Sequence, residues 1–507
     1  MASIITAITP FTLQSLPDFP YDQWRAQQEL YDSLEYIYSG EALDVKLTDP
    51  SSGKSTDKYP IKLNPLKGTA KKHASTVFGQ NVDSIRHGGL PFQIIPDLDK
   101  EQKDIAQKFQ DVIMKVLASN NFGTGMYGST ITSQYLGGAV IAAKFLPEEN
   151  RIEVHFPNPK EFLGIPKGAN YWNLMEGWIV KEITEKEARY YGYIPKMGET
   201  KFYYIEKWTE TEYKIMVNGE VIAFKSNGIK QEGEHGYGRV PIIYVPHIRE
   251  DGFIGQPIIT DAVEGIIKEL NLRWADIGDA VSEDSHSFVA VRNIRGSVKV
   301  LTIDGRPVVD LGSNTGISSN ELQPDMFAVR TQSASSPMIA FGEELMDAYR
   351  REVNHPAVAD GEDEGSQRSS LTLTTRMWPL VAEAEAERLF WTSGLIEFTR
   401  ILTSIMVSKN MEGATKEMLD YPLIVQWQPM LPRDREALVQ EAGVRASNDL
   451  GSKRHLMGLF GDVQDTETML EEVIDEKEQL TKFEQQPQFG NNTSNNTGAN
   501  TPGNSAD

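Results

Sequence analysis

A glycine-rich motif, Gly123-Thr-Gly125-Met-Tyr-Gly128, has the spacing that brings a backbone close to the pyrophosphate of a dinucleotide. In dinucleotide-binding folds this motif follows a strand, and an acidic residue at the end of the next strand binds the ribose. Here the motif follows a helical pattern, and no acidic residue stands at the corresponding place. We therefore expect no bound dinucleotide, and we interpret the glycines as part of a turn between two helices.

The other residue types that carry chemistry form no recognisable catalytic or metal-binding pattern. The chain has no cysteine, which excludes disulfides, thiolate catalysis and cysteine-ligated metals. It has no Gly-x-x-x-x-Gly-Lys-Ser/Thr loop for ATP phosphates and no Gly-x-Ser-x-Gly nucleophile motif. Its 8 histidines include no pair at the i, i+4 spacing of metal ligands on one helix. We expect neither enzymatic activity nor a cofactor.

Three alternating glutamates, Glu383, Glu385 and Glu387, put two carboxylates on one face of a predicted helix. Such a pair can act in acid–base catalysis, but a solvated helix face requires no further partner. We interpret these glutamates as solvated.

Basic residues gather in one stretch at Arg292, Arg295, Lys299 and Arg306. Their cationic groups can bind phosphate or an acidic patch on a docking protein, or they can simply keep the surface soluble. A second basic run, at residues 67–73, is equally ambiguous. The sequence leaves these alternatives open.

Acidic residues framed by glycines gather at Asp360, Glu362, Asp363 and Glu364. The surrounding stretch, 354–368, has little apolar content and interrupts the helical pattern on both sides. It can be a flexible acidic loop, or it can line a passage for another anion, where like charge would keep contacts weak and transient. Both interpretations stay open.

Composition limits the class of protein in which these residues lie. A chain of 507 residues with 39% apolar residues is large enough for a folded core. The net charge of −22 repels DNA phosphates and anionic membranes, which argues against a protein that reads DNA sequence. The lack of cysteine fits a reducing, intracellular setting. We expect neither a signal peptide nor a membrane span, because no basic start and no long apolar run are present.

The N-terminal half alternates between helical and strand patterns. Apolar residues follow helical spacing at 21–37, 105–117 and 125–137. From 139 to about 250 the period is two, and Asn218-Gly219 marks a hairpin turn that needs positive φ at both residues. We therefore expect a mostly antiparallel sheet.

Long helical runs dominate the C-terminal half, at 256–285, 335–353 and 369–409. Short strand signals separate the first two runs, which carry apolar stripes. These two helices can fold against their own domain, or they can project and pack against neighbouring copies around an axis. The third run contains Pro379, which predicts a kink because proline removes a backbone hydrogen bond and clashes with the preceding turn.

The order of these elements resembles the portal proteins of tailed bacteriophages. Leu270-Asn-Leu-Arg-Trp-Ala-Asp-Ile-Gly-Asp-Ala280 is similar to the family's first stem helix, and the stretch from Gln426-Trp427-Gln428-Pro429 to Pro432-Arg433-Asp434 is similar to the start of its crown. The family has no short diagnostic signature, so the resemblance lies in element order along nearly the whole chain. The chain departs from the family pattern in its long acidic loop.

The resemblance implies a helix-rich α+β fold with an α/β wing, a two-helix stem, a small α/β clip, a long kinked helix and a helical crown. The segments would be the wing at 1–255, the first stem helix at 256–285, the clip at 286–334, the second stem helix at 335–353, the tunnel loop at 354–368, the kinked wing helix at 369–420, the crown at 421–483 and a disordered tail at 484–507. The four basic residues would lie in the clip, against DNA or a docking protein, and the four acidic residues in the tunnel loop.

The implied function is a ring-shaped DNA channel at one capsid vertex, used in genome packaging, head–tail joining and DNA ejection. The implied partners are further copies in a ring, by resemblance a dodecamer, double-stranded DNA without sequence specificity, the terminase large subunit, the scaffolding and major capsid proteins and a head–tail adaptor, with no membrane. The protein would be assembled in the host cytoplasm and located in the virion. The alternative is another self-assembling virion protein, such as a tail or connector component.

Overall fold

The computed structural model describes residues 11–41, 62–79, 90–98, 102–168, 170–223, 230–250, 252–285, 288–292, 299–303, 306–310, 325–329, 335–362, 370–411, 413–431, 435–448, 469–470 and 473–477. The chain divides into two compact units, Met1–Leu431 and Pro432–Asp507. The helical crown implied at 421–483 falls largely in the second unit, whose described part includes the helix α9 (Arg435–Ser447). The predicted tail at 484–507 lies outside the described residues.

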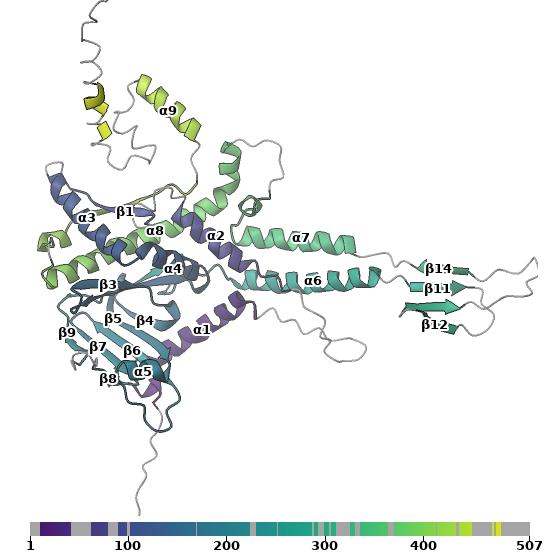
Figure 1. Cartoon of the computed structure of the whole chain (residues 1–507), viewed down its shortest axis with the longest axis horizontal. Coiled ribbons are helices and arrows are strands. Elements are labelled where there is room, and N and C mark those ends of the chain that lie inside the picture. Colours follow the sequence, from purple (N-terminus) through teal and green to yellow (C-terminus); the bar gives the residue numbers. More distant parts are fainter. Residues whose placement is uncertain are drawn as a thin grey trace, which may run out of the picture. The chain divides into compact units, whose positions relative to one another are not determined.

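The first unit begins with the helices α1 (Tyr21–Ser39), α2 (Leu66–Phe78), α3 (Lys103–Ser119) and α4 (Phe122–Leu136) (Figure 1). Helix α1 buries the apolar face that its spacing predicts, including Trp24, Tyr31 and Leu34, and it ends at Gly40, whose φ is 90°. The helices predicted at 105–117 and 125–137 are α3 and α4, so these predictions are confirmed.

Helix α2 has no counterpart in the sequence analysis. Its buried face consists largely of small and polar residues, among them Thr69, Ala70, His73 and Ala74, so no apolar stripe marks it. It packs against α4 and α8, and the basic run at residues 67–73 lies within it.

The sheets of the first unit are antiparallel, as expected. One has the strand order β10 (Ile242–Pro246), β2 (Gly138–Leu146), β3 (Arg151–His155). A larger one contains β4 (Phe162–Lys167), β5 (Asn170–Ile183), β6 (Phe202–Thr209), β7 (Glu212–Val217) and β8 (Glu220–Val221), with β9 (Glu232–Glu234) paired to β7. The turn between β7 and β8 has φ values of 47° at Asn218 and 78° at Gly219, which confirms the predicted hairpin.

The first unit also contains a pair of strands that lie far apart in the sequence. Strand β1 (Phe92–Pro96) pairs with β15 (Leu423–Trp427), with Phe92 opposite Trp427. Residues 423–427 therefore belong to the first unit, which ends at Leu431.

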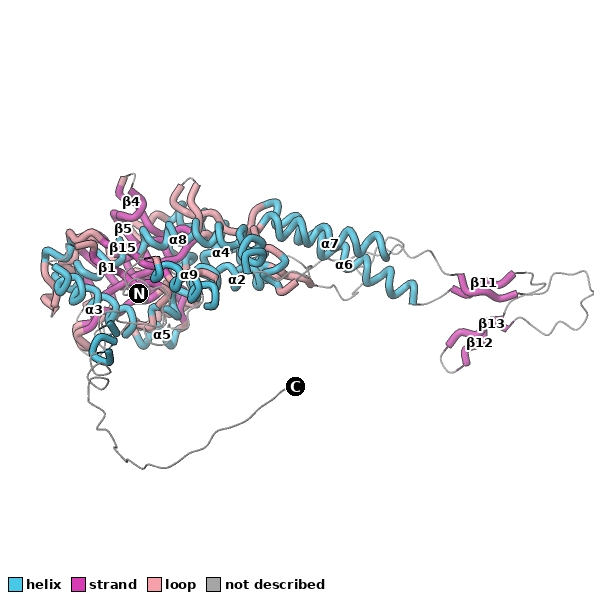
Figure 2. The backbone as a smooth tube through the Cα atoms, turned by 90° about the horizontal axis from the view of Figure 1, so that it is seen from above, coloured by secondary structure: helices cyan, strands magenta, loops and turns pink. Residues whose placement is uncertain are grey.

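Helices α6 (Asp261–Ser285) and α7 (Ser335–Glu352) lie side by side (Figures 1 and 2). The chain between them forms two separate strand pairs, β11 (Phe288–Arg292) with β14 (Asp325–Val329), and β12 (Lys299–Ile303) with β13 (Arg306–Asp310). At one end of the helix pair, Val263, Ile267 and Tyr349 are buried in a cluster with α1 and α2. Phe341, nearer the start of α7, is 46% exposed.

The longest described helix is α8 (Ser370–Ser408), which packs on the strands β10 and β2, and α4 also packs on β2. Trp391, Phe398 and Leu402 of α8 lie in the main core of the unit. Pro379 lies inside α8, which runs on to Ser408; a kink there stays a prediction. The remaining short elements are α5 (Glu185–Tyr190) and the 3₁₀ turns η1 (Leu13–Ser15), η4 (Pro159–Glu161), η5 (Ala357–Asp360) and η6 (Lys416–Leu419). No helix in the described part of the chain has the length and the apolar character of a membrane span.

The glycine motif occupies a different place from the one expected. Gly123, Gly125 and Gly128 lie inside α4, and the turn before α4 is made by Asn121, whose φ is 52°. The interpretation as turn glycines is therefore wrong. Gly125 serves packing instead, because a Cβ at this position would stand 2.3 Å from the ring of Phe156.

Candidate functional site

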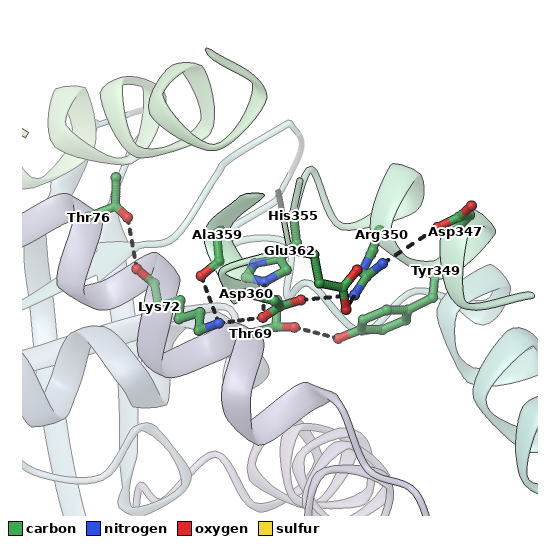
Figure 3. Close-up of polar contacts among 10 residues, drawn as sticks. All are labelled: Thr69, Lys72, Thr76, Asp347, Tyr349, Arg350, His355, Ala359, Asp360 and Glu362. Carbon is green, nitrogen blue, oxygen red and sulfur yellow. Dashed lines mark hydrogen bonds and ion pairs between the residues drawn. The ribbon is translucent and has the colours of Figure 1, made fainter. Parts of the chain in front are cut away.

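The acidic stretch 354–368 begins in a turn that is held between α2 and α7 (Figure 3). Residues 354–362 are described, and the backbone of Ala357–Asp360 is a 3₁₀ turn that ends at Gly361, with φ 84°. The backbone N–H of His355 donates to the carbonyl of Arg350 at 2.9 Å, which ties the turn to the end of α7. Asp363 and Glu364 lie outside the described residues.

Asp360 is the centre of an ion-pair cluster that also contains Lys72, Arg350, His355 and Glu362. Its carboxylate accepts a hydrogen bond from Lys72 Nζ, lies 3.1 Å from His355 Nε2 and lies 3.3 Å from Arg350 Nη2. Lys72 Nζ also donates to the carbonyl of Ala359 at 2.8 Å. One carboxylate thus joins α2, α7 and the turn.

Arg350 also binds Glu362, the second acidic residue of the turn. Its Nη2 donates to Glu362 at 2.7 Å, and Asp347 on the same helix lies 3.6 Å from Nη1. Its Nε is buried and has no hydrogen-bond partner in the described part of the chain. The hydrogen bond to Glu362 is the main cause that raises the pKa of Arg350, so the guanidinium stays charged.

Two histidines at these ion pairs are buried. The rings of His73 and His355 stack with centroids 5.8 Å apart, and the two side chains are 2% and 3% exposed. Burial is the main cause that lowers the pKa of both, to about 3 for His73, so both rings are neutral near pH 7. Beside them, the Thr69 and Tyr349 hydroxyls share a hydrogen bond of 2.8 Å that joins α2 to α7.

The partners of Asp360 keep its carboxyl group deprotonated. Burial alone would raise the pKa of Asp360, but the hydrogen bonds from Lys72 and His355 outweigh it and hold this pKa below its usual value. The carboxylate is therefore charged at neutral pH, and the turn is closed by charge-assisted hydrogen bonds. Within the described residues, no group of three or more His, Asp or Glu side chains could hold a metal ion.

Sequence reasoning found the acidic residues but not their partners. Lys72 and Asp360 are 288 positions apart, and no local pattern indicates their contact. The only local indication of these partners was the basic run at residues 67–73, whose positive charges can pair with acidic residues. The sequence did not predict that this run lies in a helix.

A second polar cluster lies inside the first unit, around Glu387, which is 1% exposed. Its carboxylate accepts hydrogen bonds from Gln134 at 2.7 Å, Ser133 at 3.1 Å and Trp391 at 3.3 Å, and His247 Nε2 lies 3.6 Å away. Burial raises its pKa. The interpretation of Glu387 as a solvated residue is therefore wrong, because its helix is covered on that side by α4.

The predicted basic cluster is divided between the two strand pairs that lie between α6 and α7. Arg292 is in β11, opposite Asp325, whereas Lys299 and Arg306 are in β12 and β13, with Lys299 opposite Asp310. Arg295 lies outside the described residues. The described backbone therefore does not bring these residues into one ladder.

Comparison with known proteins identifies the family of the chain, which the geometry of the site does not. No curated protein matches the chain. A protein family described as "Phage portal protein, SPP1 Gp6-like" matches residues 22–482, which is most of the chain. Portal proteins are structural components of the virion and not enzymes, and the match favours a portal protein over another self-assembling virion component. The chain therefore belongs to the SPP1 Gp6-like family of phage portal proteins.

Proposed function

We propose that this portal protein acts as one subunit of a closed ring whose axial channel carries the phage genome through one capsid vertex. The family match over residues 22–482 is the observation that carries this proposal, because the family implies a capsid-vertex DNA channel and a homo-oligomeric ring. The negative charge of −22 supports a channel that lets DNA pass without reading its sequence.

The paired helices α6 and α7 are proposed as the stem of the ring, with the strand pairs β11–β14 and β12–β13 as the clip. Phe341 is 46% exposed and Ile339 is 38% exposed on α7, although both are apolar. Packing of this helix pair against the same pair of a neighbouring subunit would remove these side chains from water.

The remaining segments follow the same proposal. Residues 1–255 form the wing, 354–368 the tunnel loop, 369–420 the long helix of the wing, and the C-terminal helices the crown. The pairing of β15 with β1 favours a crown that starts after Leu431 and not at 421. Asp360, Glu362, Asp363 and Glu364 would face the channel, and Arg292, Arg295, Lys299 and Arg306 would face DNA or a docking protein.

The proposed partners are those that a channel at a capsid vertex requires. They are further copies of the chain in a ring, by resemblance a dodecamer, the DNA duplex, the terminase large subunit that drives packaging, the scaffolding and major capsid proteins, and a head–tail adaptor. The subunits would assemble in the host cytoplasm and remain in the virion.

A substitution in the proposed stem tests this arrangement. Phe341→Asp would put a charge into the subunit contact, so we expect it to reduce the ring fraction at least tenfold, which corresponds to about 1.4 kcal/mol. Light scattering of the purified protein measures this fraction. Tyr190→Asp is the control, because Tyr190 is 75% exposed on α5, outside the stem. Equal ring fractions for Phe341→Asp and the unsubstituted protein would contradict the proposed stem contact.

A further inference from the structure

Lys72 and Arg350 present their cationic groups to the same small region from two different helices. Lys72 Nζ contacts Asp360, and Arg350 Nη2 contacts Asp360 at 3.3 Å and Glu362 at 2.7 Å (Figure 3). The occupants of this region are therefore two carboxylates. A phosphate group offers the same kind of acceptor, anionic oxygens that bind guanidinium and ammonium groups.

The carboxylates are placed so that another anion can compete with them. The side chains of Lys72, Asp360 and Glu362 are 38%, 32% and 56% exposed, so a dissolved anion can reach the cations and the carboxylates that they bind. The basic pair is thus open to an anion from the solvent, which would compete with Asp360 and Glu362 for the same cations.

The connectivity distinguishes this cluster from ordinary surface ion pairs of the same protein. Lys268 with Glu264, and Arg189 with Glu185, are i, i+4 pairs within one helix, so the acid stays next to the cation as long as the helix is folded. Asp360 and Glu362 instead belong to a turn that contributes little to the core. They can withdraw from Lys72 and Arg350 while α2 and α7 stay folded.

We propose that Lys72 and Arg350 form a phosphate-binding pair for the DNA backbone, which Asp360 and Glu362 occupy when the channel contains no DNA. This inference rests on the proposed function, because DNA must pass the turn. An incoming phosphate accepts hydrogen bonds from Lys72 Nζ and Arg350 Nη2 and repels the two carboxylates. The acidic turn then moves away from α2, and DNA contact and turn position become coupled.

Binding of a short mixed-sequence DNA duplex to purified rings, measured by fluorescence anisotropy over a range of salt concentrations, tests this site. Asp360→Asn and Glu362→Gln each remove one competing carboxylate. We expect each to tighten binding severalfold and to steepen the dependence of log K on log salt by up to about 0.9 for each additional phosphate that the protein neutralises. Adding Lys72→Gln to Asp360→Asn should cancel the tighter binding.

Glu344→Gln is the matched control. It also removes one negative charge from this region and frees an arginine, Arg351, from a 3.3 Å ion pair, but it leaves the turn untouched. We expect it to change binding less than twofold. Glu362→Gln guards against a folding defect of Asp360→Asn, because Glu362 is largely exposed.

Electron micrographs of the unsubstituted protein separate the two levels of the argument. If it forms no rings, the proposed function fails and this inference fails with it. If rings form, but Glu344→Gln tightens binding as much as Asp360→Asn, or none of the variants changes it, only the phosphate-binding pair is contradicted.

Discussion

At the scale of single residues, Glu387 is an ionisable residue that is buried in the core. Its carboxylate has donors from Ser133, Gln134 and Trp391, and burial raises its pKa. Removing the side chain would leave these donors without an acceptor, and buried donors without partners are costly.

We expect Glu387→Ala to lower the free energy of unfolding by about 2–4 kcal/mol. Urea denaturation followed by tryptophan fluorescence measures this change. Glu385→Ala is the control, since Glu385 is exposed on the same helix, and its effect should stay within about 0.5 kcal/mol. Similar losses for both variants would mean that the polar cluster contributes nothing beyond helix stability.

His73 makes the stability of the first unit depend on pH. Burial, followed by the neighbouring imidazoles of His355 and His247, lowers its pKa from 6.5 to about 3. Between these values the unfolded chain binds a proton at this position and the folded chain does not. Stability from this group is therefore complete above about pH 6.5 and falls by about 1.4 kcal/mol for each unit as the pH decreases toward 3.

We expect His73→Gln to reduce the loss of stability between pH 7 and pH 5 by about 2 kcal/mol relative to the unsubstituted protein. Urea denaturation at the two pH values measures the difference. An unchanged pH dependence would show that His73 is not the titrating group.

At the scale of elements, helix α4 owes its close contact with the sheet to glycine. A Cβ at Gly125 would stand 2.3 Å from the Phe156 ring, whereas a Cβ at Gly128 would meet nothing within 4 Å. Packing therefore requires a glycine at position 125 but not at position 128.

We expect Gly125→Ala to destabilise the protein by about 1–3 kcal/mol through overpacking, and Gly128→Ala to stabilise it by about 0.5–1 kcal/mol through helix propensity. Thermal unfolding of the two variants distinguishes these outcomes by the sign of the change. A stabilising Gly125→Ala would mean that Phe156 yields at little cost and that the contact does not require glycine.

Elements with a strong apolar period could be predicted from sequence, and elements without one could not. The helical spacing of apolar residues predicted α1, α6 and α7, whether or not the chain's own fold buries these residues. Helix α2 was missed because its buried face is small and polar. The pairing of β1 with β15 was missed because only the folded chain brings Phe92 next to Trp427.

The same limit applies to the candidate site. Composition and glycine spacing pointed to Asp360 and Glu362, because an acidic, apolar-poor stretch is a local property of the sequence. Their cations come from α2 and from the end of α7, and Glu387 is buried by α4, which lies far away in the sequence. Charges that are paired or buried through such distant contacts have no local signature.

At the scale of the whole molecule, the chain has apolar residues that its own fold leaves exposed on α7, together with a large negative charge. In the proposed ring, each stem would bury these side chains against the next stem. If the proposed channel wall shares the negative charge of the chain, it would repel DNA at short range and let the duplex slide.

The mass and shape of the purified particle test the central claim most directly. Light scattering at several protein and salt concentrations, together with negative-stain electron microscopy of the same samples, should show closed rings with a central channel and a mass that is a multiple of the 56.7 kDa subunit. Conditions that promote assembly must be included, because subunits can be isolated before they form rings. Monomers and dimers alone under all of these conditions, with no ring in the images, would contradict the account.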